Sequence, residues 1–412
     1  MHALDYENCV ANGTCPHLAR LGETGVTYTR TSTSKPSDSF PGLMALVTGG
    51  TPKTVGAYYD VAFDRVLAPP AVDTGNGLEH GPCGCELEHR GASRCKDGVG
   101  AVLHTAVPDP NGGAWTDSFV NIQCYDQLKV NAVLNWIDGR THLGTGRAPV
   151  PTIFGMNFQA VSVGQKLIEN GRKGGYTDAA GTPTGDMQSE ISFVDGAIGQ
   201  MVAELSSRGL LESTALIITA KHGQSPIDTH RFFPIPGHSG TNGVSPSALL
   251  SGFLPASEIG GIGPTEDDVS LLWLTHSSDT AAAVDVLEAN SAAAGIGQIF
   301  AGPSLETMFN RPGLPSTGGD PRTPDIILQP NAGVVYTGSS KKQAEHGGFA
   351  HDDTNVIMLV SHPGLRARTI TSFVETTQVA PTILRLLGLD PNSLSAVRKE
   401  GTPVLPGLDF DR

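Results

Sequence analysis

The stretch Thr214-Ala-Leu-Ile-Ile-Thr-Ala-Lys-His-Gly, residues 214–223, sets a short apolar run directly before a lysine, a histidine and a glycine. A run that is apolar on both faces is typical of a central strand in a parallel sheet that helices cover on both sides. The preceding residues 191–205 repeat their apolar positions at steps of 3, 4, 4 and 3, which defines one face of a helix. Further apolar runs lie at 152–155, 325–328 and 355–360, and a second helical pattern covers 376–387. The alternation predicts an α/β layered fold.

Composition excludes several classes of protein. The 412 residues carry 27 Lys and Arg against 41 Asp and Glu, which gives a net charge of −14 and argues against a nucleic-acid surface. No apolar run approaches the roughly 18 residues that a membrane-spanning helix needs. Residues 1–30 contain three acidic residues and no apolar core, so we expect no signal peptide in the chain as numbered.

No hydrophilic linker divides the chain, and we therefore expect one domain over residues 1–412. Residues 234–264 are rich in Gly, Ser and Pro, and residues 270–300 then follow a strand, helix, strand pattern. We interpret residues 224–320 as an inserted α+β cap subdomain that covers the site.

The cysteines indicate the compartment. An even number of cysteines in Gly-rich and Asn-rich loops favours disulfides and an oxidising environment, extracellular or periplasmic. The alternative is a four-cysteine zinc site, but Cys83-Gly-Cys85 is too tight for the paired spacing that such sites use. The pairing remains open among Cys9, Cys15, Cys83, Cys85, Cys95 and Cys124.

Three segments at predicted strand ends carry the groups that chemistry needs. Ligands of open α/β sheets collect at the carboxyl ends of strands. Lys221 and His222 follow one strand, His346 precedes a cluster that includes Asp352 and Asp353, and Ser39 lies in Ser37-Asp-Ser-Phe-Pro-Gly. Each also has a plain alternative, because most of the thirteen histidines are structural, Ser/Pro/Asp clusters form turns, and a lysine at a strand end extends to solvent.

Five stretches, taken in order, resemble the type I phosphodiesterase/nucleotide pyrophosphatase family of the alkaline phosphatase superfamily. They begin at Cys15-Pro-His-Leu-Ala-Arg-Leu-Gly, Pro36-Ser-Asp-Ser-Phe-Pro, Val194-Asp-Gly-Ala-Ile-Gly, Glu345-His-Gly-Gly-Phe and Thr376-Thr-Gln-Val-Ala-Pro-Thr-Ile-Leu-Arg-Leu-Leu-Gly. The resemblance spans nearly the whole chain. It implies an alkaline-phosphatase-like α/β/α sandwich with a mostly parallel central sheet, and a small phosphate ester as substrate.

The resemblance also implies a mechanism. In the family two metal ions, usually zinc, hold a Thr or Ser nucleophile that attacks a phosphoryl group, and water then cleaves the phospho-enzyme. By position, Ser39 is the nucleophile, His222 matches the histidine of the family's Asp-His-Gly, and His346 matches the late metal-binding histidine.

The chain departs from the family at four places. The first metal-binding Asp would lie before Met1, and we expect a truncated or misassigned start with an upstream strand. Lys221 replaces the aspartate of Asp-His-Gly, and the segment from Asn157 holds no Asp-x-x-x-His pair. Gly42 stands where an asparagine is usual. Since catalytic zinc normally takes about three protein ligands per ion, a full two-metal site is not expected.

These observations lead to one main interpretation and one alternative. We expect a phosphate-ester hydrolase whose catalytic residues are Ser39, Lys221 and His222, with Asn157 and Lys221 binding the substrate. A reduced site for zinc or another divalent metal would use His222, His346 and Asp352. The alternative is an inactive family member that binds an anion or a partner. A sulfatase would need an arginine after Ser37-Asp-Ser-Phe-Pro, and a cofactor-independent phosphoglycerate mutase would keep all metal ligands.

Overall fold

The computed structural model describes residues 1–67, 114–237, 240–255 and 265–409. The α-helices are α1 Ala3–Ala11, α2 Pro16–Glu23, α3 Ser39–Thr48, α4 Pro52–Val55, α5 Phe119–Ile137, α6 Ala160–Lys166, α7 Gly185–Ser207, α8 Pro246–Leu249, α9 Thr280–Ala289, α10 Pro303–Glu306, α11 His351–Thr354, α12 Val379–Leu386 and α13 Ser395–Glu400. The strands are β1 Gly25–Tyr28, β2 Thr31–Ser32, β3 Ile168–Glu169, β4 Arg172–Lys173, β5 Leu216–Thr219, β6 Phe233–Pro234, β7 Thr265–Glu266, β8 Ser270–Leu272, β9 Ile296–Ala301, β10 Ile326–Pro330, β11 Val334–Val335, β12 Met358–Ser361, β13 Arg368–Ile370 and β14 Val374–Glu375.

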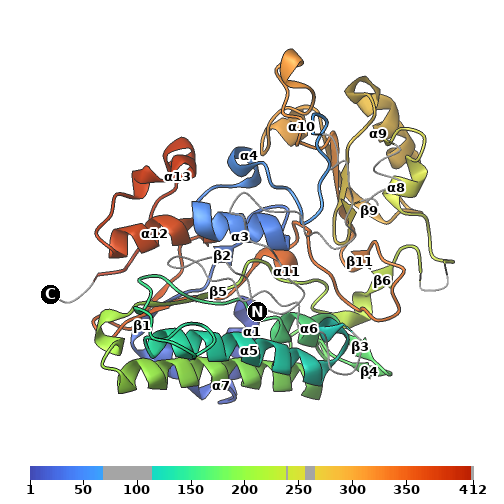
Figure 1. The fold of residues 1–412 in the computed structure, drawn as a ribbon. Coiled ribbons are helices and arrows are strands. Elements are labelled where there is room, and N and C mark those ends of the chain that lie inside the picture. The colour runs from blue at the N-terminus through green and yellow to red at the C-terminus, as the bar shows by residue number, and fades with distance from the viewer. Residues whose placement is uncertain (68–113, 238–239, 256–264, 410–412) are drawn as a thin grey trace.

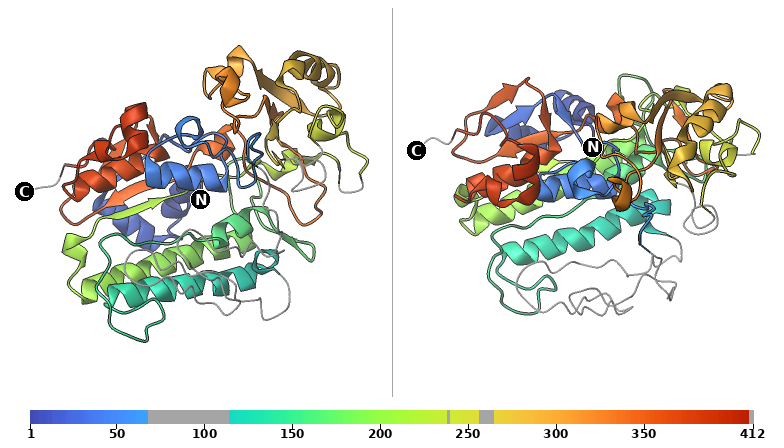
Figure 2. Two further views of the ribbon diagram at one scale, coloured as in Figure 1. Left: turned by 45° about the horizontal axis from the view of Figure 1, so that its top comes forward. Right: turned by 90° about the horizontal axis from the view of Figure 1, so that it is seen from above.

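A four-stranded sheet in the order β13-β1-β12-β5 lies between two layers of helices. Side chains alternate along β12 and the residue before it. Ile357 and Leu359 pack into the core cluster beside α2 and α7, while Met358 and Val360 pack beside α12. Helices α5 and α7 run along one face, and α3 and α12 cover the other (Figures 1 and 2). This arrangement buries both faces of β12, as its continuous apolar sequence predicts.

A second sheet has the order β7-β8-β10-β9 and is antiparallel throughout. One face packs against α8 and α9 through Leu250 and Leu287, and the other packs against Tyr58, Tyr59 and Trp273. The run at 325–328, predicted to lie in the central sheet, is β10 of this second sheet instead. Its apolar pattern indicates a strand that is buried on both faces, and a strand in either sheet is buried in this way. The interpretation of residues 224–320 as a cap stays a prediction.

The predicted α/β class is confirmed, and so are the helices at 191–205 and 376–387. The direction of pairing differs from the expectation of a mostly parallel sheet. Within the described central sheet β1 and β13 pair in parallel, whereas β12 is antiparallel to both β1 and β5. Residues 152–155, predicted as a strand, form bends and irregular backbone. The difference in direction arises because a continuous apolar run indicates burial and not strand direction or pairing. At 152–155 the run does not report burial either, since residues 152, 153 and 155 are exposed.

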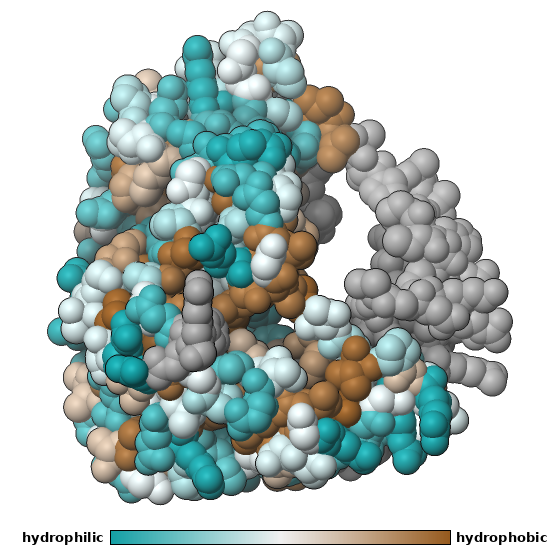
Figure 3. Space-filling model, turned by 90° about the vertical axis from the view of Figure 1, so that its left-hand side faces the viewer, coloured by the Kyte–Doolittle hydropathy of each residue, from teal (hydrophilic) through white to brown (hydrophobic). Residues whose placement is uncertain are grey.

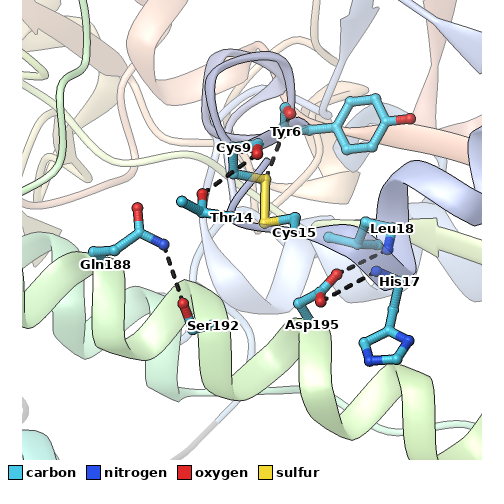
Figure 4. The surroundings of a disulfide bond; sticks show 9 residues. All are labelled: Tyr6, Cys9, Thr14, Cys15, His17, Leu18, Gln188, Ser192 and Asp195. Atoms are coloured by element: carbon cyan, nitrogen blue, oxygen red, sulfur yellow. Dashed lines mark hydrogen bonds between the residues drawn. A yellow bond between two sulfur atoms is a disulfide. The ribbon is translucent and has the colours of Figure 1, made fainter. Parts of the chain in front are cut away.

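A disulfide between Cys9 and Cys15 joins the end of α1 to the start of α2 (Figure 4). The start of α2 is held further by Asp195 of α7, whose carboxylate accepts hydrogen bonds from the backbone N–H groups of His17 and Leu18. Cys124 is an exposed free thiol, and Cys83, Cys85 and Cys95 lie outside the described residues. Among the helices described, none has the length and apolar character needed to cross a membrane.

Candidate active site

Ser39 is the first residue of α3, and its position is fixed by the residue before it. The buried Asp38 caps the helix, with a carboxylate oxygen that accepts hydrogen bonds from the N–H groups of Phe40 at 3.4 Å and Asp60 at 2.7 Å. Such a cap is a common start for a helix, because it satisfies N–H groups that lack a partner within the helix. The Ser39 hydroxyl is thereby aimed at the end of β5.

His222 lies three residues beyond β5 and contacts Ser39 directly. Its Nε2 lies 3.0 Å from Ser39 Oγ, and its Nδ1 lies 2.8 Å from the carbonyl oxygen of Gly223. Because a carbonyl only accepts, Nδ1 carries the proton, and in the neutral ring Nε2 accepts from the Ser39 hydroxyl. Burial, followed by the neighbouring His346, holds the pKa of His222 well below its usual value. The ring is therefore neutral at pH 7 and positioned as a base toward Ser39.

Two glycines allow the elements that carry Ser39 and His222 to meet. A Cβ atom on Gly42 would lie 2.1 Å from the carbonyl oxygen of Lys221, and one on Gly223 would lie 2.2 Å from the carbonyl oxygen of Asp352. Neither position accepts a side chain without displacing backbone. The departure from asparagine at position 42 thus coincides with direct packing of α3 on the segment after β5.

His346 completes the core of the site. Its ring centroid lies 4.1 Å from that of His222, and its Nδ1 lies 3.1 Å from Oδ1 of Asp38. Its carbonyl oxygen accepts from the N–H of Asp268, at the start of the second sheet. Burial first, and then the lysines Lys166, Lys221 and Lys342, hold the pKa of His346 well below its usual value.

Lys221 brings a cation to the same place. Within the described part of the chain its ammonium forms no hydrogen bond and no ion pair within 4 Å, and its nearest charges are Asp60 and Asp38. Burial lowers the pKa of Lys221, while those two carboxylates raise it. Burial and the proximity of Asp38 raise the pKa of Asp60 to about 6. Lys221 is therefore a cation of the site that is available to an anion.

These groups open into a cavity of about 1650 Å³ between the two helical layers. Ser39, Lys221, His222 and His346 all line it, as does Asn157, whose carbonyl oxygen also accepts from Lys129. Figure 3 views the face near α12 and shows apolar side chains gathered around the hollow between the layers. The structure thus brings together five of the six predicted site residues.

Asp352 is the predicted site residue that lies apart. Its carboxylate accepts from the N–H of Ile227 at 2.9 Å, and the residue does not line the cavity. Asp353, beside it, is buried, and it shares the hydroxyl of Ser225 with Asp268. The carboxylate neighbour of His346 is Asp38 instead, with Oδ1 3.1 Å from Nδ1.

The donor set does not fit the family's two-metal site. In the described residues no group of three His, Cys, Asp or Glu side chains is arranged to hold a metal ion. Both ring nitrogens of His222 are engaged by Ser39 and Gly223, and Lys221 places a positive charge where the family has a carboxylate. A cation beside a cation is unfavourable at short range, so we derive no step through zinc.

Sequence reasoning did not single out Asp38, Asp60 or Lys166. Asp38 had a signal, since an aspartate before a Ser-Phe-Pro start is a common helix cap. Asp60 and Lys166 had none, because their neighbours in space are distant in sequence. Lys166 is the last residue of α6 and lines the cavity close to Glu345.

The fold and the site define an α/β protein with a serine, a histidine and a lysine gathered at one cavity. The family model for type I phosphodiesterase/nucleotide pyrophosphatase matches residues 3–88 and 162–353, and the chain belongs to this family. No curated protein sequence gave a significant match.

Solved structures agree on the fold. Murine ectonucleotide pyrophosphatase/phosphodiesterase 5 matches with a TM-score of 0.56 and 15% identity over 92% of this chain and 91% of that chain. An inactive variant of the same murine protein in complex with AMP matches with a TM-score of 0.57, over 92% of this chain and 90% of that one. At this identity the likeness shows the alkaline-phosphatase-like architecture.

Proposed function

We propose that this protein hydrolyses phosphate esters, as a phosphodiesterase or nucleotide pyrophosphatase does, through Ser39. The observation that carries the proposal is the 3.0 Å contact between Ser39 Oγ and His222 Nε2 at the wall of the cavity. Membership of the family supports the reaction class. The unpaired ammonium of Lys221 among the described residues supports an anionic substrate.

The proposed reaction has two steps. Ser39 Oγ attacks phosphorus while its proton passes to His222 Nε2, and the bond from phosphorus to the leaving oxygen breaks as that oxygen takes the proton from the imidazolium. A water molecule then gives a proton to His222 Nε2 and attacks phosphorus of the phosphoserine. The bond from phosphorus to Ser39 Oγ breaks as Oγ takes that proton from the imidazolium, which restores Ser39 and His222 and releases the phosphate product. Lys221 stabilises negative charge on the phosphoryl oxygens throughout.

We propose a reduced or absent metal site, although zinc is the usual cofactor of the family. Bound zinc would neutralise charge and lower the pKa of the nucleophile. In this chain Lys221 would neutralise part of the negative charge, and His222 would activate the nucleophile by accepting the proton of Ser39. Kinetics with and without metal distinguish this mechanism from that of a zinc enzyme.

The test is an assay of p-nitrophenyl phosphate and bis-p-nitrophenyl phosphate on the wild type and Ser39→Ala, each with a chelator and with added zinc. We expect the wild type to release p-nitrophenol in chelator, and Ser39→Ala to lose about 10³-fold or more of that rate. Equal rates in the two proteins would remove Ser39 from the mechanism. Turnover that requires zinc would contradict the mechanism in which Lys221 and His222 act without a metal.

A second candidate is an inactive family member that binds an anion. The replacement of a metal-binding carboxylate by Lys221 favours it, because such a change commonly ends metal catalysis while it leaves an anion site. This alternative predicts that neither protein turns over either substrate, with chelator or with added zinc.

Two further proposals concern the setting of the site. We propose that residues 224–320 cap the cavity and select the substrate, which the hydrogen bond from Asp268 to His346 supports. We also propose an extracellular or periplasmic location, which the Cys9–Cys15 disulfide supports because disulfides persist in oxidising compartments.

A further inference from the structure

Lys166 is a second cation at the cavity, and its charge is only partly compensated. Its side chain is 19% exposed, and its Nζ lies 3.7 Å from Oε2 of Glu345, beyond hydrogen-bond distance. The other oxygen of Glu345 binds Lys342 closely. Glu345 is itself buried, so one carboxylate faces two ammonium groups.

Three other acids near Lys166 are engaged with other partners. Asp38 accepts from two backbone N–H groups, Asp267 accepts from the Tyr59 hydroxyl at 2.6 Å, and Asp268 accepts from the Ser225 hydroxyl at 2.9 Å. Burial raises the pKa of Asp38, Asp60, Asp267 and Asp268. Burial lowers the pKa of Lys166, and these carboxyl groups raise it.

A nearby lysine shows what a fully compensated ammonium looks like in this protein. Lys129 lies 2.6 Å from a carboxylate oxygen of Asp126 and donates to the carbonyl oxygen of Asn157 at 2.7 Å. Lys166 and Lys221 lack such close partners among the described residues, and both line the cavity beside Ser39. Two cations that line the same cavity as Ser39, and that both lower the pKa of His346, are suited to an anion with several oxygens.

We propose that Lys166 and Lys221 together form a phosphate-binding site that operates without a divalent metal, with the two ammonium groups on the non-bridging oxygens of the phosphoryl group. The inference deepens the proposed function, on which its catalytic meaning rests. It assigns to Lys166 a substrate-binding role in the family's cavity that the sequence did not indicate, and it makes Glu345 the residue that positions Lys166.

The test measures the binding of inorganic phosphate by titration calorimetry in the presence of a chelator. We expect the wild type to bind phosphate, and Lys166→Met and Lys221→Met each to raise the Kd about tenfold or more. Lys173→Met is the matched control, since Lys173 lies exposed in β4, a few residues after α6, and should leave the Kd unchanged. Binding that requires zinc, or a Kd unaffected by Lys166→Met, would overturn the inference.

A second measurement does not depend on how the variants fold. Limited acylation of amines in the wild type, read by peptide mass spectrometry, should label Lys166 and Lys221 less when phosphate is present, while Lys173 labels equally. Protection of Lys221 alone would show that Lys166 takes no part.

The two proposals fail in different ways. If phosphate binds through both lysines but no ester is cleaved, this inference stands and the proposed hydrolase function falls. If esters are cleaved through Ser39 while Lys166→Met binds phosphate as the wild type does, the proposed function stands and this inference falls.

Discussion

At the scale of single residues, the division of labour between the two nitrogens of His222 decides what Ser39 can do. Nδ1 donates to the carbonyl oxygen of Gly223 and so leaves Nε2 free to accept from Ser39. A backbone carbonyl here takes the orienting role that a carboxylate plays in the Ser-His-Asp arrangement. The consequence is a neutral base whose tautomer is fixed by the main chain and is insensitive to substitution of a third side chain.

Replacing His222 tests this role directly. His222→Asn keeps a polar group near Gly223 but removes the base, so we expect the rate of p-nitrophenol release to fall about 10²–10⁴-fold. Thermal unfolding should confirm that the variant is folded. His230→Asn is the control, because the side chain of His230 is 78% exposed and contacts Asp228 away from the cavity. Wild-type rates in His222→Asn would show that another group accepts the proton.

At the scale of elements, the close approach of α3 to the segment after β5 holds Ser39 against His222. Gly42 lies three residues after Ser39 on the same helix and touches the carbonyl of Lys221. A glycine on α3 thus allows the proposed nucleophile, Ser39, to lie against the proposed base, His222.

Gly42→Ala should separate the two groups. The added Cβ would meet the Lys221 carbonyl oxygen at 2.1 Å, so we expect a loss of about 1–3 kcal/mol of stability and a fall in kcat/KM of roughly tenfold or more. Gly196→Ala on α7 is the control, since no atom lies within 4 Å of the position, and it should be stabilising by about 0.5–1 kcal/mol. Full activity in Gly42→Ala would contradict the assigned role of this contact.

The packing of α7 against α5 and α6 contains a second feature that can be tested. Glu190 is fully buried, and burial, together with Asp126, raises its pKa to about 8. At a pH between the ordinary pKa of glutamate and about 8, Glu190 is protonated in the folded protein but ionised in the unfolded chain. The free energy of unfolding should therefore fall as the pH rises through that range.

Glu190→Gln should remove this dependence. At pH 8–9 we expect the variant to unfold at a higher temperature than the wild type, with a free energy of unfolding that is larger by about 1–2 kcal/mol. At pH 5 the two proteins should differ less. Calorimetric scans at both pH values provide the measurement. Glu288→Gln on α9 replaces an exposed glutamate and should leave the pH profile unchanged. An unchanged profile in Glu190→Gln would mean that Glu190 is charged in the folded protein.

At the scale of the whole molecule, the site lies where the second sheet meets the central one. Tyr59 packs in the cluster beneath the second sheet, and its hydroxyl donates to Asp267. The next residue, Asp268, donates its N–H to the carbonyl of His346. The second sheet thus supports the backbone that carries one of the two site histidines.

Tyr59→Phe should therefore lower the catalytic rate more than Tyr58→Phe does. We expect kcat to fall about tenfold with a smaller change in KM, because His346, whose ring centroid lies 4.1 Å from that of His222, loses support that no bound substrate restores. Tyr58→Phe is the matched control. It removes a hydroxyl that binds Thr323 at 2.8 Å in the same cluster, and it should cost a similar 1 kcal/mol or so of stability while it preserves kcat. Equal kinetic effects from the two variants would assign Tyr59 a purely structural part.

Much of this molecule follows from the order of its residues. The continuous apolar runs and the helical periodicity determined the α/β class, and the motifs around Ser39, His222 and His346 determined the family. They succeed because periodicity and motif spacing are local properties of a chain. The direction of β12 and the sheet to which β10 belongs were not local, since burial on both faces looks the same in either arrangement.

Only the tertiary structure decided which side chains meet. Ser39 and His222 are separated by 183 positions, and their contact depends on α3 lying against the end of β5. Lys166 reaches the cavity because α6 ends there, and Asp352 turns instead to the backbone of Ile227. The sequence identifies the groups capable of chemistry. The distances between them depend on packing, which results from many weak contacts between distant segments and therefore cannot be predicted from any one segment.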